Sequence, residues 1–69
     1  MNSEIIFVVE EAPEGGYTAK ALGQSIFTEA ATLPDLRENV REAVLTHYDE
    51  SNQPTIIRLH FVKEELIKV

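Results

Sequence analysis

The chain has 69 residues, and its twelve acidic residues outnumber six basic ones for a formal net charge of −6. A chain of this length forms one domain, residues 1–69, whose hydrophobic core supplies only about 3–5 kcal/mol of net stability. Cysteine is absent, which excludes disulfides, thiolate metal sites and a cysteine nucleophile. We therefore expect a homodimer, because a partner subunit is the remaining means of stabilising so small a core.

Charge and hydropathy also restrict the setting in which the protein acts. The first residues, Met1–Glu4, lack the basic region of a signal peptide. The longest uninterrupted apolar run, Ile5–Val9, is far too short to cross a bilayer. We expect a soluble, cytoplasmic protein with no membrane partner. We also expect no direct nucleic-acid binding, because phosphate backbones repel an acidic surface. The negative charge suits a basic protein partner, or it serves only to keep the protein soluble.

Residues 4–10 are rich in β-branched side chains and predict the first strand. Both of its faces are apolar, with Ile5, Phe7 and Val9 on one and Ile6 and Val8 on the other. A single helix covers only one face of a sheet, so the second face needs another cover. We therefore place Ile6 and Val8 in the predicted dimer interface.

Turn chemistry divides the next segment into two strands. Residues 12–16 (Ala-Pro-Glu-Gly-Gly) are typical of a tight turn. We predict strands at residues 17–22 and 25–30, separated by a two-residue break at Gly23-Gln24. The first half of the chain is therefore expected to be a three-stranded antiparallel meander.

The start of a helix is signalled by Thr32 as N-cap, Pro34 in the first turn and Asp35 three residues after the cap. Apolar and aromatic side chains then recur at helical spacing, at Leu33, Leu36, Val40, Ala43, Val44, His47 and Tyr48. Residues 51–54 are predicted to end the helix, with Asn52 as a left-handed cap before Pro54.

Residues 55–62 alternate in polarity and predict the last strand. Residues 64–69 are too apolar for simple disorder, so they are expected either to add an edge strand in the same subunit or to lie across a neighbour. Their apolar members, Leu66, Ile67 and Val69, complete the predicted dimer interface. The expected fold is a two-layer α+β domain of β-β-β-α-β order, with one helix packed on one face of the sheet.

No catalytic constellation is visible along the chain. His47 and His60 are the two histidines and show no metal-ligand spacing, and Ser25 lacks both a nucleophile motif and a base. We therefore predict no enzyme activity, metal or cofactor. Two groups of acids are candidate contacts for a basic partner, with a solvated surface as the alternative: Glu10, Glu11 and Glu14 near the first turn, and Asp49 and Glu50 after the helix.

Several short motifs together resemble the HicB family: Glu14-Gly15-Gly16-Tyr17, the Gly23 break, and residues 29–36 continuing to Ala43-Val44. The run from Thr32-Leu33 to Arg41-Glu42-Ala43 is similar to the helix signature of that family.

The resemblance implies a partial ribonuclease-H-like fold without ribonuclease-H catalysis. It also implies an antitoxin-type interaction protein that binds a small basic RNA-cleaving toxin of the HicA type. Because the chain has no room for the DNA-binding module of many members, a solitary HicB-like domain is expected. The alternative is an accessory subunit or small-molecule-binding protein associated with a metabolic enzyme.

Overall fold

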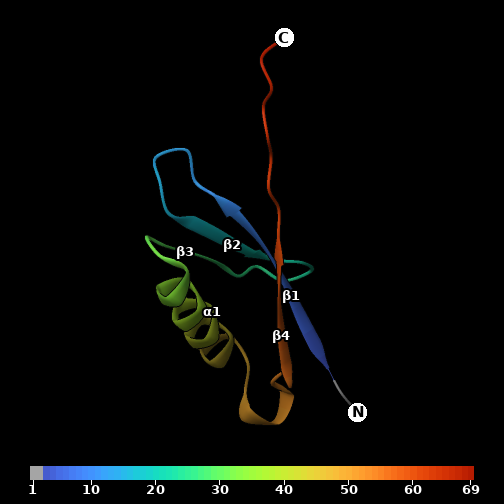
Figure 1. The fold of residues 1–69 in the computed structure, drawn as a ribbon. Helices are drawn as coiled ribbons and strands as arrows, with labels where there is room; N and C mark the ends of the chain where they lie inside the picture. Colours follow the sequence, from blue (N-terminus) through green and yellow to red (C-terminus); the bar gives the residue numbers. More distant parts are fainter. Residues whose placement is uncertain (1–2) are drawn as a thin grey trace.

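The computed structural model describes residues 3–69. Met1 and Asn2, which the predicted domain includes, lie outside the described residues. Figure 1 shows the elements in chain order: β1 (Glu4–Glu11), β2 (Tyr17–Ala21), β3 (Phe27–Ala30), α1 (Leu33–His47), the short 3-10 helix η1 (Glu50–Asn52) and β4 (Ile56–Phe61). The predicted α+β class and the β-β-β-α-β order are confirmed.

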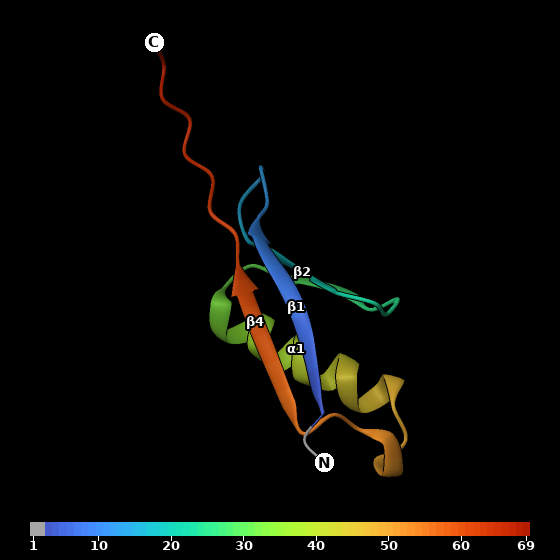
Figure 2. The same ribbon diagram turned by 90° about the vertical axis from the view of Figure 1, so that its right-hand side faces the viewer.

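The four strands form one mixed sheet in the order β3-β2-β1-β4. β1 pairs antiparallel with β2, and β2 with β3, which is the predicted meander. β4 joins on the other side of β1 and runs parallel to it, with Phe7 opposite Leu59 (Figure 2). The chain reaches β4 only after crossing through α1, and a crossover of this kind allows two strands to align in parallel.

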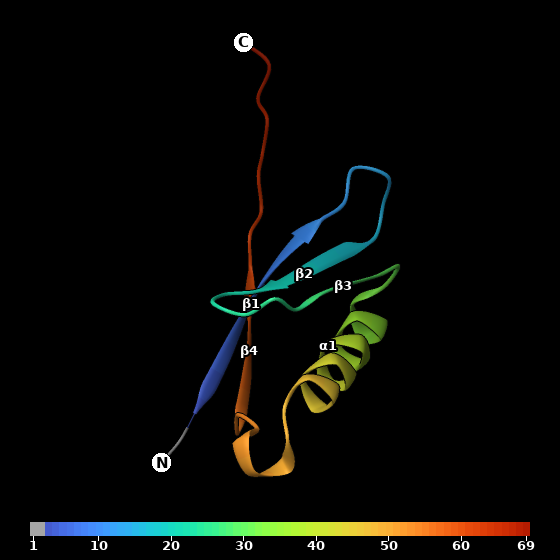
Figure 3. The ribbon, with the colours of Figure 1, turned by 180° about the vertical axis from the view of Figure 1, so that it is seen from behind.

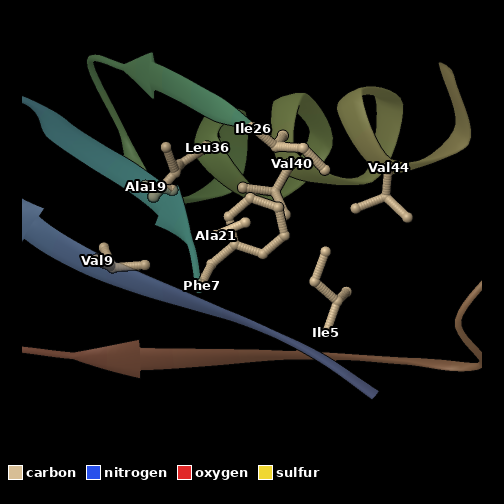
Figure 4. Packing of buried hydrophobic residues seen from close by; sticks show 9 residues of the cluster. All are labelled: Ile5, Phe7, Val9, Ala19, Ala21, Ile26, Leu36, Val40 and Val44. Atoms are coloured by element: carbon tan, nitrogen blue, oxygen red, sulfur yellow. The ribbon is translucent and has the colours of Figure 1, made fainter. Parts of the chain in front are cut away.

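The core lies between α1 and one face of the sheet (Figure 4). Its fully buried members are Ile5, Phe7, Val9, Ala19, Ala21, Ile26, Leu36, Val40 and Val44. The face of β1 that meets the helix is therefore the one that carries Ile5, Phe7 and Val9. Ile6 and Val8, on the other face, are half-buried although no second layer lies over them.

The predicted start of α1 is confirmed. Thr32 has extended backbone angles, and its hydroxyl accepts a hydrogen bond from the backbone N–H of Asp35 at 3.3 Å. Pro34 lies in the first turn, where a missing backbone donor costs nothing. The apolar stripe is confirmed at Leu36, Val40 and Val44, which are buried. The prediction that His47 belongs to the apolar stripe is wrong, because its side chain is exposed.

The predicted end of the helix is wrong. α1 ends at His47, and its C-cap is Tyr48 in an extended conformation. Asn52 lies in η1 and is not a left-handed cap, because only glycines have positive φ among the described residues. The side chain of Tyr48 packs against the core, which places the chain on its course toward β4 before Asn52 is reached.

The break between the second and third strands is also longer than the predicted Gly23-Gln24. β2 ends at Ala21 and β3 begins only at Phe27. Ile26 lies inside this connection and is buried, and its carbonyl accepts a hydrogen bond from Ala21 N–H at 3.0 Å. Burial of Ile26 bends the chain inward, so Ser25 and Ile26 do not join the strand.

Residues 62–69, which we call the C-terminal extension, continue beyond β4 and form no strand in their own chain. The first of the two predicted alternatives, an edge strand in the same subunit, is therefore wrong. The extension projects away from the body beside the β1–β2 hairpin (Figures 1 and 3). Among residues 3–69, no helix has both the length and the apolar character needed to span a membrane.

Candidate functional site

A groove of about 650 Å³ lies between the β1–β2 hairpin and the C-terminal extension. It is lined by Glu10, Glu11, Ala12, Pro13, Glu14, Thr18, Glu29, Val62, Lys63, Glu64 and Leu66. Five glutamates thus line it against one lysine, and all five are exposed. We call this feature the acidic groove.

Strand register places two of these glutamates in one row. Glu10 lies opposite Thr18 on β2, and Thr18 lies opposite Glu29 on β3. Directly paired residues project from the same face of a sheet, so all three side chains are on the face that α1 does not cover. β3 is fastened to α1 in turn, because the side-chain amide of Asn39 donates a hydrogen bond to the carbonyl of Glu29 at 3.1 Å.

The turn holds the remaining hairpin glutamates near this row. Ala12 N–H donates to Gly16 O at 3.0 Å, and Gly15 N–H donates to Ala12 O at 2.9 Å. Gly16 has φ +83°, and a Cβ at this position would lie 2.8 Å from the carbonyl oxygen of Ala30. The hairpin therefore approaches the end of β3 too closely for any residue larger than glycine at position 16. Glu14 lies at the tip of the hairpin.

The structure separates the two predicted groups of acids. Glu10, Glu11 and Glu14 lie together in the acidic groove. Asp49 and Glu50 lie at η1, at the opposite end of β1 from the hairpin (Figure 1). A single small partner surface placed in the groove would therefore contact the first group and not the second.

Sequence reasoning missed Glu29 and Glu64 as members of the groove. The signal for Glu29 was available in the meander, since pairing of adjacent strands brings it beside Thr18. Glu64 had no such local signal. It reaches the groove because β4 is parallel to β1, which directs the C-terminal extension toward the same end as the hairpin.

The predicted dimer-interface residues also fall in two places. Ile6 and Val8 are at the centre of the open sheet face, with Arg58 and His60 of β4 as their direct neighbours. Leu66, Ile67 and Val69 lie in the C-terminal extension and are exposed. The structure of one chain does not bring the two groups together.

The two histidines are far from forming a site. His47, at the end of α1, packs its ring edge-on against Tyr48 with 4.9 Å between ring centroids. His60 lies on the sheet face that α1 does not cover, opposite Val8. Ser25 is exposed in the β2–β3 connection. Within residues 3–69, no group of three or more histidine, aspartate and glutamate side chains is placed to hold a metal ion.

One ion pair crosses the sheet at the end away from the groove. Arg58 Nε lies 2.6 Å from Glu4 Oε1, and its Nη2 donates to Oε2 at 3.2 Å, a two-point contact. The hydrogen bond from Arg58 lowers the pKa of Glu4 below its ordinary value, and the positive charge of the guanidinium adds to this effect. The pair links the start of β1 to β4.

Comparison with known proteins identifies two relatives. The chain is 50% identical to a UPF0150 protein of Archaeoglobus fulgidus over 52 residues, which span 75% of this chain and 77% of the relative. It is 39% identical to a UPF0150 protein of Thermotoga maritima over 66 residues, which span 96% of this chain and 93% of the relative. No family model matches the sequence, and no solved structure matches it. On the identity and coverage of these relatives, the chain belongs to the family of UPF0150 proteins.

Proposed function

We propose that this protein is a non-catalytic, HicB-like interaction protein that binds a small basic RNA-cleaving toxin in the acidic groove. The observation that carries the proposal is the gathering of five glutamates, from the hairpin, β3 and the C-terminal extension, around a single groove. The β-β-β-α-β order supports it, because the motifs that resemble the HicB family lie along elements in this order.

The charge of the groove suits this class of partner. A protein that cleaves RNA must hold a phosphate backbone, and it does so with lysine and arginine side chains. A row of carboxylates such as Glu10 and Glu29 is negatively charged, as the phosphates of RNA are, and can bind the same basic surface. The acidic groove would therefore compete with RNA for the toxin and cover its RNA-binding surface.

Exposure of the carboxylates determines how the interaction behaves. Charges in water contribute more to association rate and partner choice than to affinity, and salt screens them over about 8 Å at physiological ionic strength. We expect binding to weaken as the salt concentration rises. The absence of cysteine suits a partner met in the reducing cytoplasm.

The first test is co-purification of the tagged protein from its native host, with mass spectrometry of what it retains. We expect a small basic protein whose toxicity in cells is relieved by co-expression of this chain. Recovery of no small basic partner, together with no rescue of cells that express candidate toxins, would contradict the proposal.

A matched pair of variants then locates the binding surface. Glu14→Lys with Glu29→Lys reverses two charges of the acidic groove, whereas Asp49→Lys with Glu50→Lys makes the same change in net charge at the other end of β1. We expect the groove variant to abolish toxin binding and the η1 variant to retain most of it. Equal losses would show that only net charge matters, and the assignment of the groove would then be wrong.

A further inference from the structure

Exposed apolar side chains are concentrated on β4 and on the C-terminal extension that continues it. Within residues 3–69, eight large hydrophobic residues are exposed, and five of them belong to β4 or to the C-terminal extension: Ile56, Phe61, Leu66, Ile67 and Val69. Leu66 is 94% exposed and Ile67 is 80% exposed. Single apolar residues on a surface need no explanation, but a contiguous set marks an interaction site.

β4 also has an unpaired backbone edge. β4 is the last strand of the sheet, and among residues 3–69 it has β1 on one side and no strand on the other (Figure 2). Val62 N–H donates to Val9 O at 2.9 Å. Backbone groups of successive residues in a strand point to opposite sides, so those of Ile57, Leu59 and Phe61 point to the open edge.

The helix leaves this part of the sheet uncovered. Leu59 and Phe61 share the helix-side face with Phe7 and Val9, their direct neighbours on β1. α1 packs mainly against β2 and β3, toward the other edge. Phe61 is consequently 51% exposed although the residue beside it, Val9, is fully buried. An additional strand along β4 would cover it.

We propose that the occupant of this edge is a second copy of the chain. The two β4 strands and their C-terminal extensions pair antiparallel about a two-fold axis at Val62, which joins two four-stranded sheets into one of eight strands. Each copy has an apolar C-terminal extension and an open strand edge. The extension of one copy pairs with the open edge of the other. Such reciprocity is what a two-fold interface requires.

The backbone direction at Val62 is compatible with this register. Val62 N–H points to β1, so Val62 would form a non-hydrogen-bonded pair with its own copy. Ile57 then lies opposite Ile67 on the helix side and His60 lies opposite Glu64 on the other face, while Leu59 and Phe61 lie opposite the charged residues Glu65 and Lys63. A shift of two residues toward the C-terminus would place Arg58 opposite Lys68, which are like charges. A shift of one residue would turn every side chain to the wrong face.

A shift of two residues toward the N-terminus would move the two-fold axis to Phe61 and place Ile57 opposite Glu65 and Leu59 opposite Lys63. Cross-linking of Phe61→Cys in preference to Val62→Cys would identify that register and contradict the one centred on Val62. The register centred on Val62 pairs about thirteen residues from each copy, fewer than the 20–30 of an interface of standard size. We therefore expect a dimer that dissociates in the micromolar range.

Dimerisation would fix the position of one wall of the acidic groove. Val62 and Glu64 form one wall of the groove, and pairing with a second copy would hold this wall in place. The inference does not depend on the toxin, since its tests use the isolated protein.

A single engineered cysteine tests the register, because the natural chain contains none. At a non-hydrogen-bonded antiparallel pair the two Cα atoms lie about 4.5 Å apart, within the range of a disulfide. Val62→Cys should therefore cross-link the dimer rapidly under mild oxidation. The matched control is His60→Cys on the same face, whose two copies would lie roughly 13 Å apart along the strands and cannot form a disulfide.

A pair of prolines tests the backbone pairing. In the proposed register Ile67 N–H bonds to the partner, whereas Lys68 N–H points away from it, and proline is tolerated only where no donor is needed. We expect Ile67→Pro to raise the dissociation constant about tenfold or more, because the two-fold axis doubles the loss of hydrogen bonds. Lys68→Pro should change it by much less.

Light scattering and cross-linking together decide the outcome. The proposal expects a mass of twice the 7.8 kDa monomer at high micromolar concentration, and far more cross-linking for Val62→Cys than for His60→Cys. A monomer at every accessible concentration, or equal cross-linking of the two cysteine variants, would overturn it. Loss of toxin binding with the dimer intact would refute only the proposed function.

Discussion

Replacing Gly16 with alanine tests how closely the β1–β2 hairpin packs against the end of β3. Gly16 has φ +83°, a conformation that costs an alanine about 1–2 kcal/mol. The added Cβ would also lie 2.8 Å from Ala30 O and 3.3 Å from Ala31 Cα, both backbone atoms. Forcing an extra carbon into a packed site costs about 1–3 kcal/mol more. The expected total, about 2–5 kcal/mol, approaches the whole stability of a domain of this size.

Gly23→Ala is the matched control. Gly23 has nearly the same φ, +78°, but no atom of residues 3–69 would lie within 4 Å of a Cβ at this position. It should lose only the conformational cost of about 1–2 kcal/mol, which lowers the melting temperature by about 4–16 °C. Urea denaturation followed by circular dichroism, at one fixed protein concentration, measures both variants. If they are equally destabilised, the close approach of Gly16 to Ala30 does not exist in solution.

Three further predictions concern the core, the helix cap and the ion pair. Phe7→Ala empties the centre of the core, where Phe7 is 0% exposed; at a cost of about 3–5 kcal/mol it should abolish the cooperative thermal transition, and a retained sharp melt would argue against this core. Thr32→Ala removes the hydroxyl that accepts from Asp35 N–H and should cost about 1 kcal/mol in urea denaturation, whereas Thr32→Ser should cost little. Arg58→Gln should raise the pKa of Glu4 toward its ordinary value of 4.5, as measured by NMR titration of the carboxyl group. Because the pKa of Glu4 is lowered in the folded state, the pair contributes stability above the unfolded-state pKa, and this contribution disappears as the pH falls through the folded-state pKa; a Glu4 pKa unchanged by the substitution would contradict the role of Arg58.

Local chemistry explains which parts of the fold were predictable. The start of α1 depends on Thr32, Pro34 and Asp35, which interact within a single turn, and it was predicted to the residue. The apolar stripe needs only the helical period, and Leu36, Val40 and Val44 follow it. The end of the helix was not predictable in this way, because it depends on where Tyr48 packs in the core.

Strand boundaries and the candidate site depend on pairing between distant segments. The connection between β2 and β3 was underestimated because burial of Ile26 is a tertiary contact. Three glutamates of the acidic groove, Glu10, Glu11 and Glu14, were singled out as local neighbours near a turn. Glu29 and Glu64 were missed, since strand register and the direction of β4 bring them there.

The sequence by itself determined the size of the domain, its charge, the order of its elements and its single capped helix, since all of these follow from composition and from interactions a few residues apart. It also showed that β1 is apolar on both faces, but an alternating pattern is the same whichever face is turned inward. Only the tertiary structure decided that α1 covers the face of Phe7 and leaves that of Val8 open. It alone placed β4 parallel to β1 at an open edge, because pairing between residues some fifty positions apart leaves no local trace.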